Sequence, residues 1–351
     1  MLRLVPSLLV SVLVLSCGGS SQPAAQAPAV AQPAAPAAVG TVQLTVTAAP
    51  GRELPAIVWY PAEQPGAGAP PVLGRTLPVV VISHGLGGKK EHASFLAERV
   101  AAAGYLVAAV DHVGDGVEIA LQRPVDVTKL LDRLGERGGE PAWLADLADL
   151  DKVAVYGHSF GGYTALALAG AKVGPNPEWT ALCNAAPTTP GCPPPTPEQM
   201  KPVSLRDPRV DAVVAATPGG YIQFGRAGTA AIETPIVLLA AGKDRLIATP
   251  QYVRPLFDHA RHPRWLFEIE LANHFTFVDL CAQLAQIPPP FHDEVAEACA
   301  PDAPIALATA HALIGDVVVG SLDHLLKGAP APDLDALAKA RGIAVRADAA
   351  R

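Results

Sequence analysis

The chain has 351 residues, half of them hydrophobic, and a formal net charge of −7 at pH 7 with no dense basic run. Nucleic acids attract basic surfaces, so this composition argues against a nucleic-acid partner. After a leader and a linker, about 300 residues are left, which is enough for one large α/β domain.

The first 16 residues have the pattern of a secretory signal. A basic start precedes an apolar run, Leu4 to Leu15, which is shorter than the roughly 20 residues that a membrane span needs. The run ends in Val14-Leu15-Ser16-Cys17, which resembles a bacterial lipobox. This resemblance implies that Cys17 is lipidated and anchors the protein to a membrane surface of the cell envelope, in the periplasm or at the cell surface. The alternative is an ordinary cleaved signal in which Cys17 is incidental.

Residues 17–40 are rich in Ala and Pro and carry no charged side chain, which predicts a flexible tether. We expect one folded catalytic domain over residues 41–327. Residues 328–351 are rich in Ala and in charged residues and are expected to form a C-terminal tail, either a marginal surface helix or a frayed end.

Beyond the tether, apolar runs typical of strands alternate with stretches of helical periodicity. Strands are predicted at residues 41–47, 56–60, 77–82, 105–110, 151–156, 210–216, 235–240 and 265–271. Helices are predicted at residues 91–103, 127–134, 162–169 and 305–326. This alternation predicts an α/β fold with a mostly parallel central sheet, helices on both faces, and hairpin-like strands at one edge.

Four cysteines remain beyond Cys17, and they lie in two close pairs. Cys183 and Cys192 lie in a loop rich in Pro and Thr, and Cys281 and Cys299 flank a Pro-rich turn. Export permits disulfides, so we expect Cys183–Cys192 and Cys281–Cys299, although four cysteines allow three pairings. Neither pair has histidines at zinc-like spacing, so we expect no metal site.

The most informative motif is Gly157-His158-Ser159-Phe160-Gly161, a G-x-S-x-G sequence between a predicted strand and a predicted helix. The glycines allow the close backbone approach of a tight turn that exposes the serine hydroxyl. In this context the motif predicts a nucleophile elbow with Ser159 as the nucleophile. The alternative is a glycine-rich turn that arose by chance.

The base that activates the serine is predicted to be His274, in the loop after the strand 265–271. Functional loops of an open α/β sheet gather at the carboxyl ends of its strands, so His274 and Ser159 should share one rim. His84 and His112 also follow strands, but they precede the serine in the chain. His158 is expected to point its side chain away from the site. A structural role for His274 is the alternative.

The acid is predicted to be Asp244, which follows the strand 235–240 and so reaches the same rim. An acid there would set the tautomer of His274 and stabilise the imidazolium. The order Ser159, Asp244, His274 is that of an α/β-hydrolase triad. The alternatives are a strand-end Asp that caps a turn and Asp211, which begins a strand and so belongs to the opposite rim.

Two backbone N–H groups are expected to hold the oxyanion that forms during acyl transfer. One belongs to Phe160, directly after the serine, and the other to Leu86 in the loop His84-Gly85-Leu86-Gly87-Gly88. The alternative is a glycine loop that serves only strand–helix packing. Asp126 is expected to be the N-cap of the helix 127–134 rather than a substrate ligand.

Three motifs carry a resemblance to the α/β-hydrolase superfamily over about residues 41–326: His84-Gly-Leu-Gly-Gly, Gly157-His-Ser-Phe-Gly-Gly and Asn273-His-Phe. Further motifs resemble the bacterial dienelactone-hydrolase-like group related to plasma platelet-activating-factor acetylhydrolases: Gly104-Tyr-Leu-Val-Ala-Ala-Val-Asp-His, Arg123-Pro-Val-Asp and Leu205-Arg-Asp-Pro-Arg-Val.

The chain departs from both of these narrower families. Dienelactone hydrolases use a cysteine where this chain has Ser159, and plasma-type acetylhydrolases carry the acid one strand earlier, where this chain has Thr217-Pro218. Polyester-degrading cutinase-like enzymes are also similar, with the acid at the position of Asp244.

These observations predict an exported serine hydrolase that cleaves carboxylic esters of small, fairly apolar acyl groups through an acyl-enzyme and needs no cofactor. Candidate pocket residues are apolar: Leu86, Phe160, Tyr221, Phe224 and Phe275. Two alternatives remain, a peptidase or amidase with the same triad and a non-catalytic envelope-binding protein that keeps the fold. The Pro-rich segment 174–204 is expected to be either a lid or a surface loop.

Overall fold

The computed structural model describes residues 37–114, 120–188, 192–261, 263–289 and 291–350, which belong to the compact unit Pro36–Arg351. The predicted signal, Cys17 and nearly all of the predicted tether lie outside the described residues. In the described ranges, no helix has both the length and the apolar character that crossing a bilayer requires.

The described residues contain a ten-stranded sheet, and its six middle strands, β11 through β5, run parallel. In spatial order the strands are β12 (Val345–Ala350), β11 (Arg264–Ile269), β10 (Ile236–Ala241), β9 (Val210–Ala216), β6 (Ala148–His158), β4 (Leu77–Ser83), β5 (Leu106–Val110), β2 (Arg52–Ala62), β1 (Ala38–Ala49) and β3 (Gly66–Ala67). β2 pairs antiparallel with both β5 and β1. The mostly parallel sheet with a hairpin edge is thus confirmed.

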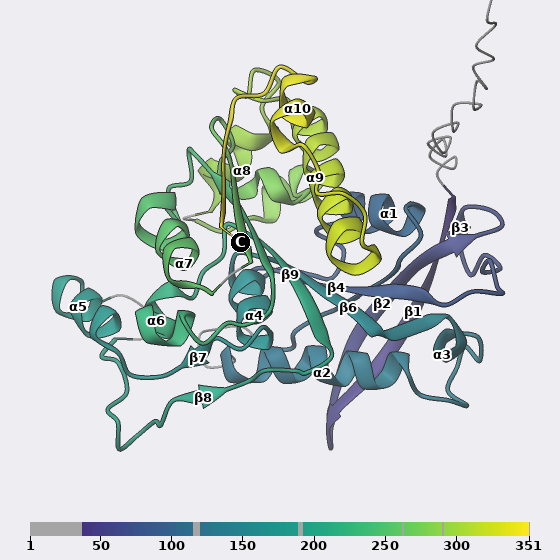
Figure 1. The fold of residues 1–351 in the computed structure, drawn as a ribbon, viewed down its shortest axis with the longest axis horizontal. Helices are drawn as coiled ribbons and strands as arrows, with labels where there is room; N and C mark the ends of the chain where they lie inside the picture. Colours follow the sequence, from purple (N-terminus) through teal and green to yellow (C-terminus); the bar gives the residue numbers. More distant parts are fainter. Residues whose placement is uncertain (1–36, 115–119, 189–191, 262, 290, 351) are drawn as a thin grey trace, which may run out of the picture. The chain divides into compact units, whose positions relative to one another are not determined.

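Helices cover both faces of this sheet (Figure 1). Those packed directly on it include α1 (Ser94–Ala102), α2 (Gln122–Leu134), α4 (Phe160–Leu168) and α9 (Leu307–Lys327). Others are α3 (Leu144–Leu147), α5 (Pro177–Ala185), α6 (Tyr221–Thr229), α7 (Arg254–His259), α8 (His292–Cys299) and α10 (Leu334–Lys339). Short turns of helix are η2 (Thr249–Val253), η3 (His274–Phe277) and η4 (Cys281–Gln286), and β7 (Lys172–Val173) pairs with β8 (Val203–Ser204).

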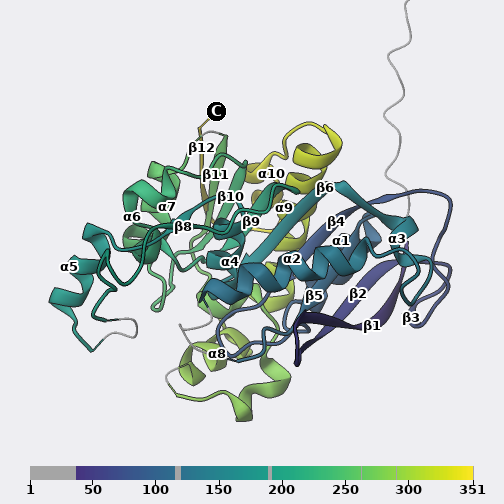
Figure 2. The ribbon, with the colours of Figure 1, turned by 90° about the horizontal axis from the view of Figure 1, so that it is seen from below.

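The alternation of side chains along β4 shows why the domain has two cores. Val79 and Val81 join the core under α2 and α4, whereas Val80 and Ile82 join the core under α1 and α9. Successive strand residues point to opposite faces, so a strand that is apolar throughout needs helices on both sides. Figure 2 shows α2 and α4 crossing one face of the strands.

Both ends of the folded unit extend beyond the predicted domain limits. β1 already begins at Ala38, inside the predicted tether. The predicted tail contains α10 and β12, and β12 pairs antiparallel with β11 from Val345↔Ile269 to Ala350↔Arg264. The short helix α10 fits one of the two expectations for the tail, but the strand β12 was not expected. Its segment is rich in Ala, which disfavours strands, and it becomes a strand by completing the exposed edge of β11.

The two expected disulfides, Cys183–Cys192 and Cys281–Cys299, are present in the structure. The first joins α5 to the loop that follows it, and the second joins η4 to α8.

Candidate active site

Ser159 lies between β6 and α4 in a conformation that only a tightly held turn maintains. Its φ is 56° and its ψ is −117°, in the left-handed region that side chains other than glycine rarely adopt. An added Cβ at Gly157 would overlap the Gly161 carbonyl, and one at Gly161 would overlap the Ser83 carbonyl. Both glycines are therefore required by the close packing of the turn, as a nucleophile elbow demands.

Asp244 and His274 meet at the same end of the sheet, after β10 and β11. His274 Nδ1 donates to Asp244 Oδ2 at 2.8 Å, and both side chains are buried. The other oxygen, Asp244 Oδ1, accepts from the backbone N–H groups of Leu246 at 2.9 Å and Ile247 at 2.6 Å. The carboxylate therefore fixes the Nδ1–H tautomer, and His274 Nε2 is left as the basic nitrogen.

The structure brings Ser159 and His274 together on the wall of one cavity of about 120 Å³. Leu86 and its neighbours Gly85, Gly87 and Gly88 line the same cavity. The loop lies directly against the serine, since an added Cβ at Gly85 would be 3.4 Å from Ser159 Cβ. The structure thus groups the predicted nucleophile, base, acid and oxyanion loop at one rim of the sheet.

His158 has a role that the sequence analysis missed. It was expected to point away, but its Nε2 donates to the His274 carbonyl at 2.9 Å, and the two rings lie 4.8 Å apart. Burial, together with the nearby His274, lowers the pKa of His158 to about 3, so its ring is neutral. The sequence shows only a residue next to the serine, and the contact depends on how the loop after β11 folds back.

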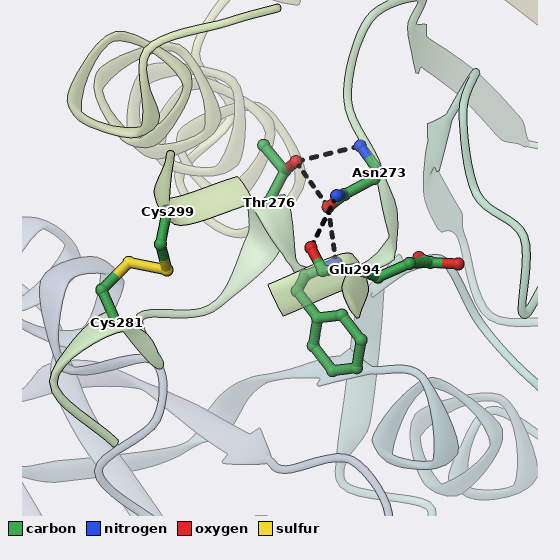
Figure 3. The surroundings of a disulfide bond; sticks show 6 residues. Asn273, Thr276, Cys281, Glu294 and Cys299 are labelled. Carbon is green, nitrogen blue, oxygen red and sulfur yellow. Dashed lines mark hydrogen bonds between the residues drawn. A yellow bond between two sulfur atoms is a disulfide. The ribbon is translucent and has the colours of Figure 1, made fainter. Parts of the chain in front are cut away.

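His92 and His158 also line the cavity, and the rest of its wall comes from residues 275–289 and 291–299, which we call the cap segment. Its apolar side chains in the wall are Phe275, Val278, Leu280, Ile287, Pro288 and Phe291. The cap segment is closed by the Cys281–Cys299 disulfide and tied to the histidine loop, because Asn273 Nδ2 donates to the Glu294 carbonyl at 2.8 Å (Figure 3). Asn273 and Thr276 also bond each other on either side of His274.

The described residues of the segment 174–204, considered as a lid, contribute nothing to this wall. It instead covers part of a second cavity of about 390 Å³ with Trp179, Cys192 and Met200. Of the expected pocket residues, Leu86 and Phe275 line the catalytic cavity, Phe160 lines the second, and Tyr221 and Phe224 line neither.

Asp126 is not an N-cap as expected. α2 begins at Gln122, so Asp126 lies one turn inside the helix, where its buried carboxylate accepts from Arg52 and His112. Among the described residues, no group of three or more His, Cys, Asp or Glu side chains could hold a metal ion.

Comparison with known proteins agrees with the fold described above. A family model described as "Serine aminopeptidase, S33" matches residues 74–206, which include the oxyanion loop and Ser159. A solved ferulic acid esterase from Streptomyces cinnamoneus superposes with a TM-score of 0.58 at 21% identity, over 87% of this chain and 95% of that chain. No curated protein matches the chain. The fold is that of the α/β-hydrolases.

Proposed function

We propose that this chain, an α/β-hydrolase by fold, is a serine esterase that works through an acyl-enzyme. One observation carries the proposal. A strained, partly exposed Ser159 and an Asp244-bound His274 line one cavity together with a glycine loop that can supply an oxyanion donor. This is the arrangement that nucleophilic acyl transfer requires.

Each residue then has a defined role in the reaction. Ser159 Oγ attacks the ester carbonyl carbon while His274 Nε2 takes the hydroxyl proton. The backbone N–H groups of Leu86 and Phe160 hold the oxyanion, each contributing about 3 kcal/mol of transition-state stabilisation. His274 then gives the proton to the departing alcohol, and a water activated by the same histidine releases the acid.

The apolar wall that the cap segment forms is evidence for a substrate with a small, apolar group. The catalytic cavity has about 120 Å³, and an apolar cavity of roughly 150 Å³ holds a benzene ring. The acyl group of the ester should therefore be about the size of a short alkyl chain or a single ring. In an acyl series from acetyl to palmitoyl on p-nitrophenyl esters, we expect the highest kcat/KM for short acyl groups, and an optimum at long chains would reject this.

Replacing the nucleophile tests the mechanism. Ser159→Ala should lower kcat by about 10⁴- to 10⁶-fold, and Ser204→Ala, an exposed serine of β8, serves as the matched control. A fluorophosphonate should label Ser159 in the native chain. Absence of labelling would favour the non-catalytic envelope-binding protein instead.

A peptidase or amidase is the second candidate, because the matched family model is described as a serine aminopeptidase. An enzyme that recognises a free amino terminus needs a negative partner for it, and none of the described residues that line the catalytic cavity is Asp or Glu. We therefore favour the ester. Matched p-nitrophenyl butyrate and butyryl p-nitroanilide assays separate the two activities.

The proposal includes export and lipid anchoring through Cys17. The two disulfides support an oxidising compartment. Intact mass of the membrane fraction should show a lipid on Cys17, and Cys17→Ala should abolish it. A mature N-terminus elsewhere would favour an ordinary cleaved signal.

A further inference from the structure

A second Ser–His–Asp set lies behind the oxyanion loop. Ser83, the last residue of β4, contacts His112 Nε2 through its Oγ at 2.9 Å, and His112 Nδ1 contacts Asp126 Oδ2 at 2.9 Å. All three residues are buried, and none lines the catalytic cavity. This set therefore cannot meet a substrate, and its polar groups need another explanation.

The hydrogen bonds define the proton positions in this set. Burial opposes ionisation of Asp126, but hydrogen bonds from His112 and Arg52 outweigh it and hold the pKa of this carboxyl below its usual range. Burial lowers the pKa of His112 to about 4. A neutral His112 donates a hydrogen bond from Nδ1 to the carboxylate, and its Nε2 accepts a hydrogen bond from the Ser83 hydroxyl. Each atom then has a single compatible role, which makes the set rigid.

The set reaches the oxyanion loop through His84. The backbone N–H of His112 donates to His84 Nε2 at 3.1 Å, and His84 Nδ1 lies 2.7 Å from the Gly85 carbonyl oxygen. An amide N–H can only donate and a carbonyl can only accept, so His84 is the neutral Nδ1–H tautomer. The Gly85 carbonyl also accepts from the Gly88 N–H at 3.2 Å, and Arg123 donates to the carbonyl of His84 itself.

The glycines of the loop make room for this ring. An added Cβ at Gly88 would be 2.9 Å from His84 Nδ1 and 3.1 Å from the Gly85 oxygen. The loop is therefore folded around the His84–Gly85 contact. Packing against a strand alone would not require the ring nitrogen to bond this carbonyl.

We propose that His84 is a positioning residue that aims the Leu86 N–H at the oxyanion. Its Nε2 accepts from the backbone N–H of His112, whose own ring is held by Ser83 and Asp126. The peptide joining Gly85 to Leu86 is planar and trans, so its C=O and N–H point in opposite directions. The His84 ring holds the C=O on the inner side of the loop, which turns the N–H outward to the cavity that Ser159 lines. This inference rests on the proposed esterase function and deepens it.

Two near-isosteric variants separate positioning from simple structural support. The Asn side-chain NH₂ takes the place of His Nδ1, so His84→Asn keeps the donor to the Gly85 carbonyl and loses the acceptor for His112. His84→Gln places its amide near Nε2, so it keeps the acceptor for His112 and loses the donor. We expect His84→Asn to retain kcat within about threefold and His84→Gln to lose about 10- to 100-fold, because a misaimed donor forfeits part of the roughly 10²- to 10³-fold that one donor supplies.

The readout is the affinity for two matched ketones. Ser159 Oγ attacks the carbonyl carbon of a trifluoromethyl ketone while His274 takes the hydroxyl proton, and the carbonyl oxygen becomes an oxyanion. The methyl ketone with the same chain is not attacked and keeps its neutral carbonyl. In His84→Gln, the dissociation constant of the trifluoromethyl ketone should rise by the same factor by which kcat/KM falls. The dissociation constant of the methyl ketone should stay unchanged.

Equal losses in the two variants, whether in kcat or in folding, would overturn the inference, as would full activity of His84→Gln. An ester activity that persists in Ser159→Ala would reject the proposed function instead, so the two failures are distinguishable.

Discussion

The two Ser–His–Asp sets of this chain share a His–Asp hydrogen bond and differ in the surroundings of the serine. The His–Asp distance is 2.8 Å in the set of Ser159 and 2.9 Å in the set of Ser83. Ser159 lies on a strained turn at a cavity, whereas Ser83 ends a strand and has no exposed surface. The comparison teaches that the same three residue types can stand in different surroundings, and that access and backbone conformation are what set Ser159 apart as the proposed nucleophile.

The acids differ as well. Asp126 is paired with the Arg52 guanidinium, whereas Asp244 is held by two neutral backbone N–H groups and, in the described part of the chain, ion-pairs only with His274. A carboxylate already neutralised by Arg stabilises an imidazolium less. Asp244 can therefore support a histidine that gains a proton in the reaction, and Asp126 suits one that stays neutral.

The largest effect should come from exchanging the two acids for amides. Asp244→Asn should lower kcat about 10⁴-fold with little change in stability, because it presents the wrong tautomer of His274. Asp126→Asn should instead cost about 2–4 kcal/mol of unfolding free energy, because it leaves Arg52 and His112 without their partner, and should lower kcat about 10-fold. Kinetics with p-nitrophenyl butyrate and urea unfolding measure both. A larger loss of kcat in Asp126→Asn than in Asp244→Asn would contradict the different roles proposed for the two acids.

The second prediction concerns pH. Burial lowers the pKa of His112 to about 4 and that of His158 to about 3, so the folded state keeps both neutral while the unfolded chain takes up protons below its ordinary value near 6.5. Stability is therefore fully present above that value and is lost as the pH falls from about 6.5 to 4, by about 1.4 kcal/mol per pH unit for each histidine. Urea unfolding across this range checks the slope.

His112→Gln and His158→Gln should each lower the measured slope by about 1.4 kcal/mol per pH unit, since each takes away one titrating ring. Other buried histidines, such as His84, whose pKa burial also lowers, keep the rest of the slope. A slope unchanged in both variants would show that these rings are not kept neutral by burial.

The third prediction uses the two disulfides as a matched pair. Removing either one should cost about 2–3 kcal/mol in the chain-entropy account. Cys281→Ala with Cys299→Ala should also raise KM several-fold for short-chain esters, because the cap segment forms the cavity wall and bonds Asn273 beside His274. Cys183→Ala with Cys192→Ala should leave KM unchanged. The same KM change in both double variants would contradict this role of the cap segment.

The smallest effect is expected for Ser83→Ala. The His112 Nε2 loses its donor, which costs about 1–2 kcal/mol of stability, but Asp126 still fixes the ring and kcat should stay within about threefold. Peptide mapping after fluorophosphonate treatment should find the label on Ser159 and none on Ser83. A labelled Ser83 would mean that the second set is open to substrate.

Much of the fold could be predicted because its signals are local. Strands that are largely apolar, such as Leu77–Ser83 and Val210–Ala216, together with the helical periods between them, predicted the parallel sheet. The elements that were missed have weak local signals. β12 forms because β11 offers an edge, and the cap segment is short helical turns held by the Cys281–Cys299 disulfide.

By itself, the sequence determined which residues could meet: Ser159, Asp244 and His274 each follow a strand, and the carboxyl ends of parallel strands share one rim. Only the tertiary structure decided the contacts between loops. It turned His158 toward the His274 carbonyl, made Asp126 the partner of His112, and placed the His112 backbone N–H against His84 Nε2. The reason is physical: strand ends are set by local backbone pattern, whereas side-chain partners across 14 to 116 residues depend on the closed loops.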